Sequence, residues 1–204
     1  MKKRTLLACA AAAVLLAACI PSVNPFYTDK DVVMDQHLFG EWEESGNTNN
    51  PEIWKFEQST NRNEYNLIVT EGEKTGQFSA HLFKLKEEQF LDLIPTDCNY
   101  ATNQADLVAY SMFPGHLLVH VRRIEPTLRL EFFDYDWLEK FLEANPKALG
   151  HHREGDRIIL TADTRALQSF VLKHLGTNEL FKAASPGDEM VRKTNGDRPG
   201  DSTK

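Results

Sequence analysis

Residues 53–57 read Ile53-Trp54-Lys55-Phe56-Glu57, so that Trp54 and Phe56 alternate with charged side chains. Successive side chains of a β-strand point to opposite faces of its sheet, which places the two aromatic residues on one face. This period of two predicts a strand with one buried face rather than a helix.

The same period recurs on both sides of this stretch. Turn-forming residues such as Gly72 and Pro126 separate several of the alternating segments. Those segments are residues 38–42, 65–69, 78–85, 90–94, 117–121 and 128–132. Short strands joined by local turns predict an antiparallel meander, in the form of a curved sheet or a partial β-barrel.

One of these segments carries large apolar side chains on both faces. Phe78, Ala80 and Leu82 share a face, but Phe83 and Leu85 fall on the other. A strand with one buried face does not need both sets, so the pattern predicts a bulge or bend near Leu82 and Phe83.

Toward the C-terminus the apolar period lengthens to three or four residues, which is typical of helices. Asp136 followed by Glu139 matches a capping box, and Pro146 ends the first helix. Asp163 or Thr164 caps a second helix. The stripes are Trp137, Leu138, Phe141 and Leu142 in the first helix, and Leu167, Phe170, Val171 and Leu175 in the second. Both stripes need a partner, so we expect an α+β fold with two C-terminal helices packed on the sheet.

These patterns divide the chain into four parts. Residues 1–18 form a removable leader, and residues 19–37 form a tether without an apolar period. Residues 38–181 form a single α+β domain. Residues 182–204 contain almost no apolar side chains, and we expect them to be disordered.

The leader has the composition of a secretory signal peptide. Lys2, Lys3 and Arg4 precede an uncharged apolar run, residues 5–18. That run is 14 residues long, whereas a helix that crosses a bilayer needs about 20. A basic start, a short apolar run and small residues at its end predict export and cleavage.

The end of this run, Leu16-Ala17-Ala18-Cys19, resembles the lipobox of bacterial lipoproteins. The resemblance implies that Cys19 becomes the first residue of the mature chain and carries a diacylglycerol thioether. Two or three acyl chains hold a protein stably on a membrane. Ile20 follows in place of aspartate, and by the same resemblance this favours the outer membrane, facing the periplasm, as the location in the cell envelope.

Charge and cysteine content narrow the functional classes. The chain carries a net charge of −7, and the leader holds three positive charges and no acid, so the remainder is near −10. This charge disfavours nucleic acid as a partner. With Cys9 in the leader and Cys19 acylated, Cys98 is alone, and no disulfide framework is expected. Cys98 is a buried apolar side chain or a thiol that needs a nearby base.

Gly40-Glu41-Trp42 resembles the G-x-W signature that opens the first strand of lipocalins and related calycins. The resemblance implies a tight entry at the glycine and a tryptophan that plugs one end of a barrel. It also implies a carrier of a small apolar ligand, with a cavity lined by Trp42, Trp54, Phe56, Tyr65 and Phe132. The alternative is a buried tryptophan in the first strand of another kind of sheet.

Three polar side chains within the predicted strands are candidates for chemistry. His116 and His120 share a strand face, and they are either a metal-binding pair that needs a third ligand or a hydrogen-bonded or solvent-facing pair. Asp92 lies among apolar residues. It is either an acid with a raised pKa in a cavity or a side chain that faces water between inward Leu91 and Leu93.

The remaining polar clusters can also be explained by the secondary structure expected around them. His151-His152 lies in a polar loop, residues 147–156. Glu131, Asp134 and Asp136 suggest a carboxylate cluster, but strand alternation and helix capping also account for them. The sequence contains no nucleophile elbow, P-loop or C-x-x-C motif.

The sequence therefore predicts a non-catalytic, membrane-anchored binding or envelope-structure module, without a metal or other cofactor. Its partners are the membrane, reached through the N-terminal lipid, and either a small apolar ligand or an envelope protein. The alternatives are the calycin-like carrier and an envelope hydrolase that uses Asp92 with His116 or His120.

Overall fold

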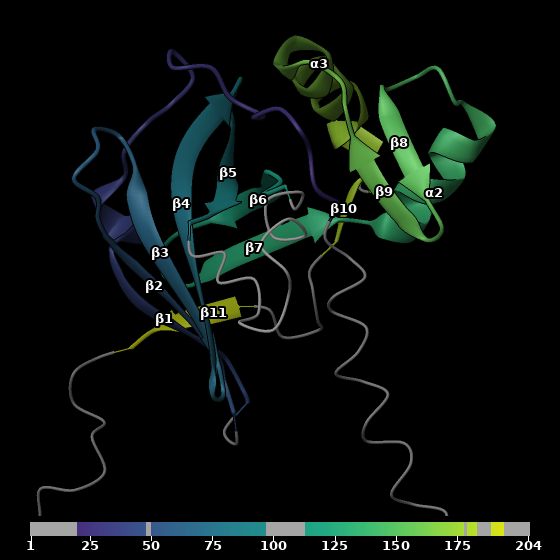
Figure 1. Cartoon of the computed structure of the whole chain (residues 1–204). Helices are drawn as coiled ribbons and strands as arrows, with labels where there is room; N and C mark the ends of the chain where they lie inside the picture. Colours follow the sequence, from purple (N-terminus) through teal and green to yellow (C-terminus); the bar gives the residue numbers. More distant parts are fainter. Residues whose placement is uncertain (1–19, 48–49, 97–112, 178, 183–188, 194–204) are drawn as a thin grey trace, which may run out of the picture.

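The computed structural model describes residues 20–47, 50–96, 113–177, 179–182 and 189–193. It contains a closed antiparallel β-barrel and, beside it, a lobe of two helices and a two-stranded sheet (Figure 1). The predicted α+β class with an antiparallel meander is confirmed. The sheet closes on itself, however, so the expected curved sheet or partial barrel is corrected to a closed one.

Eight strands form the ring. Seven follow one another around the barrel, each antiparallel to the next, and the eighth, β11, enters between β7 and β1. Because β6 also pairs with β7, no strand of the ring has an open edge. The strands are β1 (Gly40–Glu44), β2 (Glu52–Gln58), β3 (Tyr65–Glu71), β4 (Lys74–Leu85), β5 (Glu88–Pro95), β6 (Leu117–Arg123), β7 (Leu128–Phe133) and β11 (Glu189–Arg192).

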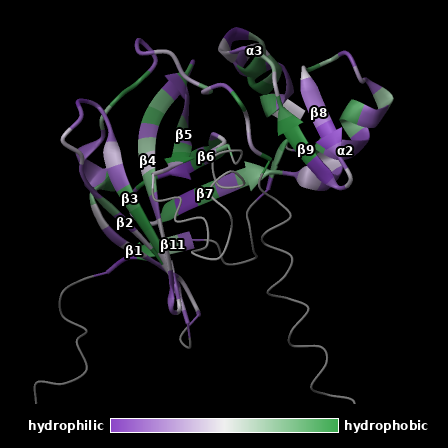
Figure 2. Ribbon diagram, in the orientation of Figure 1, coloured by the Kyte–Doolittle hydropathy of each residue, from purple (hydrophilic) through white to green (hydrophobic). Residues whose placement is uncertain are grey.

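The lobe follows β7 in the chain. Its elements are α2 (Tyr135–Ala144), β8 (His151–Glu154), β9 (Arg157–Leu160), α3 (Thr164–His174) and a 3-10 turn, η3 (Leu175–Thr177). A short strand, β10 (Phe181–Lys182), returns to pair with the end of β7. Another 3-10 turn, η2 (Gln36–Leu38), precedes the barrel. In Figure 2 β9 is hydrophobic and β8 hydrophilic, in keeping with the burial of β9 against the helices.

Large apolar side chains line the interior of the barrel. The inward residues of the eight strands form one apolar cluster, because alternate positions of every strand point inward. Trp42, Phe56 and Tyr65 are at most 2 % exposed, and Trp54 is 5 % exposed. The ring of Phe56 contacts that of Trp54, with centroids 6.1 Å apart, and that of Tyr65, with centroids 6.0 Å apart.

A second apolar cluster lies outside the barrel, between its wall and the lobe. It joins outward residues of the wall, such as Phe83, Phe90 and Phe133, to the stripes of α2 and α3. Leu82 therefore faces the inner cluster and Phe83 the outer one. The predicted bulge near these residues is wrong, since β4 pairs with β5 in unbroken register from Phe78 to Leu85. Both faces of β4 are buried there.

The segment before residue 38 is part of the folded body. Ile20 and Phe26 are 2 % and 1 % exposed and belong to the outer cluster. Ser22 bridges His116 on one side and Leu160 on the other. The predicted tether is wrong from Ile20 onward, because this segment covers a wall whose outer face is itself apolar. The expectation of a wholly disordered tail is also wrong, since Glu189–Arg192 close the barrel as β11.

Local signals account for the helix boundaries. The carboxylate of Asp134 accepts the backbone N–H of Trp137 and caps α2, so the predicted cap at Asp136 is wrong by two residues. Asp163 caps α3 by accepting the N–H of Ala166, one of the two predicted alternatives. None of the helices in the described part of the chain is long and apolar enough to span a membrane.

Gly40 and Trp42 meet the last strand at one end of the barrel. Gly40 has φ +112°, a conformation that favours glycine, and an added Cβ would lie 2.9 Å from the guanidinium of Arg192. The Arg192 guanidinium stacks 4.2 Å from the centre of the Trp42 ring. It also donates to the carbonyl oxygens of Phe39 and His37 and to Glu125.

Candidate functional site

An arginine-lined groove lies on the outer face of β6 and β7, at the part of the barrel wall that the lobe does not cover. Its volume is about 550 Å³, and it is lined by Arg122, Arg123, Arg129, Glu131 and Phe181. Phe181, from β10, forms the apolar side of the groove and stacks on Phe133 with ring centroids 5.1 Å apart.

A β-bulge brings the three arginines together. Val121 pairs with Leu130 and Arg123 pairs with Arg129, so Arg122 is an extra residue in β6. Consecutive residues of a regular strand point to opposite faces, but a bulge redirects them. Arg122 and Arg123 consequently both line the groove, and the turn between β6 and β7 places Arg129 beside them.

Two carboxylates partly neutralise this groove. The Nε of Arg122 donates to Glu131 at 2.7 Å, and a terminal nitrogen of Arg129 lies 3.6 Å from the other oxygen of that carboxylate. Arg123 pairs with Glu189 at 2.7 Å. The three guanidinium groups thus exceed the carboxylates by one positive charge, on a chain of net charge −7. Arg129 has the loosest of these contacts, and 47 % of its side chain is exposed.

Behind the groove lies a buried histidine. The His120 side chain is fully buried, its Nε2 lies 3.0 Å from Glu88, and its ring stacks on Phe90. Its Nδ1 has no hydrogen-bond partner among the described residues and lies 3.7 Å from Glu131. Burial lowers the pKa of His120, and Arg122 adds to this effect while Glu88 and Glu131 oppose it. His120 lies opposite Glu131 on the outer face of the wall, and its ring also contacts that of Phe181.

A second polar cluster holds the N-terminal segment against the barrel. Asp92 is fully buried, and one of its oxygens lies 2.6 Å from Nδ1 of His116. The other oxygen accepts the backbone N–H of Phe26 at 2.8 Å. Asp92 does point outward between inward Leu91 and Leu93, but the expectation that it faces water is wrong, because the segment from Ile20 to Tyr27 covers it.

Tyr27 and His81 complete this cluster. Their rings stack with centroids 4.5 Å apart, beside Asp92 in the neighbouring strand. Burial, together with the nearby Asp92, Asp29 and Glu64, raises the pKa of Tyr27 to about 12. Burial lowers the pKa of His81. The cluster lines neither this groove nor the pocket in the lobe, and its polar atoms serve to fasten the segment.

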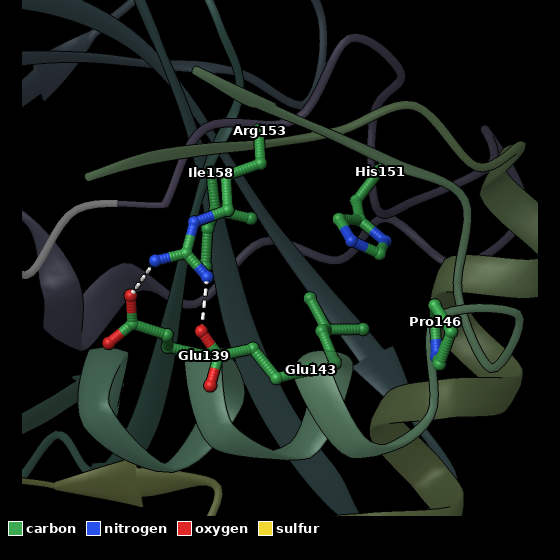
Figure 3. Close-up of a pocket in the computed structure, with 7 residues that line it drawn as sticks. Glu139, Glu143, Pro146, His151, Arg153 and Ile158 are labelled. Carbon is green, nitrogen blue, oxygen red and sulfur yellow. Dashed lines mark hydrogen bonds and ion pairs between the residues drawn. The ribbon is translucent and has the colours of Figure 1, made fainter. Parts of the chain in front are cut away.

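The lobe contains a smaller pocket of about 210 Å³ between α2 and the β8–β9 hairpin (Figure 3). Arg153 spans it and pairs with Glu143 at 2.6 Å and with Glu139. Nδ1 of His151 contacts the carbonyl oxygen of Leu149 at 2.9 Å. Because Arg153 pairs with both carboxylates, the residues of this pocket join α2 to the β8–β9 hairpin through ion pairs. His151 and His152 lie in strand β8 and not in the predicted loop.

The predicted site residues are distributed over several places. Trp42, Trp54, Phe56 and Tyr65 belong to the inner cluster of the barrel, and the partly buried Phe132 packs against it. His116 and His120 bind different carboxylates, so they form no metal pair, and the described residues include no group of three possible metal ligands. Cys19 and Cys98 lie outside the described residues.

The predicted carboxylate cluster does not converge. Glu131 enters the groove, whereas Asp134 and Asp136 both lie near Lys182. The three arginines were missed by sequence reasoning. Their signal is an Arg-Arg pair and a third arginine on either side of a predicted turn, a spacing that brings them together across a hairpin.

No family model, no curated protein and no solved structure matches this chain. Functional inference therefore rests on its own residues. Chemically, the groove offers planar guanidinium donors beside an aromatic wall, an arrangement suited to a carboxylate, phosphate or sulfate group.

Proposed function

We propose that this chain is a lipid-anchored, non-catalytic binding module of the bacterial cell envelope that binds an anionic group in the arginine-lined groove. The supporting observation is the convergence of Arg122, Arg123 and Arg129 on one groove of an otherwise acidic chain. A guanidinium offers paired N–H donors that match a carboxylate or phosphate.

The neighbours of the arginines narrow the ligand class. Arg129 has only a 3.6 Å contact with Glu131, so it is the arginine best placed to take a new partner. Phe181, which is 6 % exposed, lies beneath the groove. The groove thus suits a molecule with a compact anionic group. No step of bond making or breaking is needed for this role.

The binding proposal is tested by thermal unfolding with inorganic phosphate or citrate against chloride at matched ionic strength. Wild-type protein should show a saturable rise in unfolding temperature, because a ligand that binds only the native state stabilises it. Arg129→Gln should remove most of that rise. Arg165→Gln, at an exposed position on α3, is the matched control and should retain it. An equal rise in all three proteins would refute the groove as the site.

The anchor is tested separately by mass spectrometry of membrane-extracted protein. The lipobox resemblance implies an N-terminal peptide that begins at Cys19 and carries acyl chains. Cys19→Ala should abolish both the acylation and the recovery of the chain with membranes. An unmodified N-terminal peptide in the wild-type protein would remove the basis for the membrane location.

A calycin-like carrier is the second candidate, favoured by the closed antiparallel barrel with Trp42 in its first strand. A carrier needs an interior cavity of about 300 Å³ or more. Here the Phe56 ring contacts those of Trp54 and Tyr65 inside the barrel. Titration with a fluorescent fatty acid separates the proposals. Saturable binding that Trp54→Ala weakens and Arg129→Gln leaves unchanged would favour the carrier, and the opposite pattern would favour the groove.

The hydrolase alternative is the weakest of the three. Asp92 and His116 do contact each other, but both hydrogen-bond to the N-terminal segment, Asp92 through the N–H of Phe26 and His116 through the backbone of Ser22. His120 contacts Glu88 instead. We propose a fastening role for this pair.

A further inference from the structure

We propose that the surface formed by Pro21, Val23 and Phe113 lies directly on the membrane and contacts the lipid interface. This inference rests on the proposed lipid anchor at Cys19. It adds that the body of the protein does not hang free on a tether but is held in one orientation on the bilayer.

The proposed anchor lies directly beside the folded body in the sequence. Ile20 is 2 % exposed and packs in the outer cluster, and Ser22 is fully buried. Consecutive Cα atoms are about 3.8 Å apart, so a lipid on Cys19 begins within one residue of the folded body. No flexible spacer separates the two, and the surface around Ile20 must therefore be the surface nearest the bilayer.

That surface presents apolar side chains. Residues 20–23 run as an extended segment in which Ile20 and Ser22 point inward, so Pro21 and Val23 point outward. Val23 is 41 % exposed and Phe113 is 51 % exposed. A Cβ placed on Gly115 would lie 2.6 Å from the side chain of Pro21 and 3.6 Å from the ring of Phe113, so both side chains flank the same glycine.

The charge pattern points in the same direction. Ser22 bridges His116 and Leu160, so residues 20–24, 113–117 and 158–162 lie side by side. None of these 15 residues is Asp, Glu, Lys or Arg, although such residues make up 26 % of the chain. Charged side chains are costly to bring against hydrocarbon, and aromatic side chains are favoured at the lipid interface. The uncharged region thus coincides with the point of attachment.

The occupant we infer is a zwitterionic lipid surface. The chain after the leader carries a net charge near −10, which repels anionic headgroups. Exposed apolar side chains beside the anchor add to its hold by burying area at the boundary between headgroups and acyl chains.

The test uses the full chain, processed and acylated, in phosphatidylcholine vesicles with and without bromine on the acyl chains. Phe113→Trp places a fluorophore in the proposed surface. Val191→Trp is the matched control, because Val191 is similarly exposed, at 43 %, but lies on β11 at the base of the barrel (Figure 1). The signal is the emission of each variant minus that of the parent chain, whose three tryptophans are unchanged.

We expect the Phe113→Trp emission to shift to the blue on vesicle binding and to lose most of its intensity with brominated lipid. The Val191→Trp emission should change little. Vesicle co-sedimentation with equal, weak quenching of both variants would overturn this inference and leave the anchor standing. Failure of the acylated chain to co-sediment would overturn both. Circular dichroism of each variant confirms that it is folded.

Discussion

Arg192, in strand β11, contacts the start of β1 and the residues just before it. Its guanidinium covers the ring of Trp42, accounts for the glycine at position 40, and donates to the carbonyl oxygens of Phe39 and His37. These carbonyl groups belong to the chain just before β1, so one side chain joins the two ends of the fold.

We predict that Arg192→Ala lowers the free energy of unfolding by about 2–3 kcal/mol, because it removes a cation–π contact and several charge-assisted hydrogen bonds. Urea unfolding measures this change. Lys193→Ala, the matched control, removes only ion pairs with Glu41 and Glu43 that are 3.7–4.0 Å long and partly exposed. It should cost less than about 1 kcal/mol. Equal losses for the two variants would contradict the role of Arg192.

His120 makes stability depend on pH. Burial holds its folded pKa below the ordinary value of 6.5, so the unfolded chain binds the proton first as the pH falls. Its contribution to stability is therefore complete above pH 6.5 and is lost as the pH falls through that value toward the lower folded pKa.

We expect His120→Gln to flatten the fall in unfolding free energy between pH 7 and pH 5 by up to about 1.4 kcal/mol per pH unit, the effect of one proton. Glutamine keeps an N–H donor near Glu88 but does not titrate. Urea unfolding at each pH gives the slope. His152→Gln, at an exposed position, is the control and should follow the wild-type slope. A wild-type slope in His120→Gln would show that the proton taken up on unfolding binds to another group.

At the scale of elements, β11 decides whether the barrel has an edge. It pairs with β1 from Trp42 to Glu44 and with β7 at Leu128 and Arg129. Without it, β1 and β7 each expose a row of unpaired backbone groups, a common cause of aggregation. Met190 would also leave the inner cluster.

A chain that ends after Lys182 should therefore lose its cooperative thermal transition and aggregate on heating. A chain that ends after Lys193 retains every described contact of β11 and should unfold like the full-length protein. Circular dichroism and light scattering during heating compare the two. Cooperative unfolding of the shorter chain at an unchanged temperature would show that β11 is dispensable.

At the scale of the whole molecule, two apolar clusters share one wall. The inner cluster lies inside the barrel and the outer one joins β4–β7 to the helices and the N-terminal segment. Because Leu82 and Phe83 are neighbours in one strand and face different clusters, neither cluster can lose its order without disturbing the other.

We predict that barrel and lobe unfold in a single transition. In Trp137→Phe the remaining tryptophans, Trp42 and Trp54, both report on the barrel interior. Their fluorescence and the far-ultraviolet circular dichroism, which also includes α2 and α3, should give the same urea midpoint. A separate, earlier loss of helical signal would instead identify the lobe as an independently unfolding unit.

Much of the fold follows from local patterns. The alternation around Trp54 and Phe56 and the longer period around Leu138 and Phe170 correctly located strands and helices, since these periods reflect only which face each residue presents. The cap at Asp163 could also be predicted, because a capping side chain acts within one turn of its own helix.

What the sequence by itself determined is the strands β1 to β7, the helices α2 and α3, and which of their faces are apolar. Only the tertiary structure decided where those faces meet. It closed the barrel through Glu189–Arg192, covered Asp92 with the N-terminal segment, and gathered Arg122, Arg123 and Arg129 in one groove through a bulge. The reason is physical: a period records the environment of a residue relative to its neighbours in sequence, whereas closure, coverage and convergence join residues far apart along the chain.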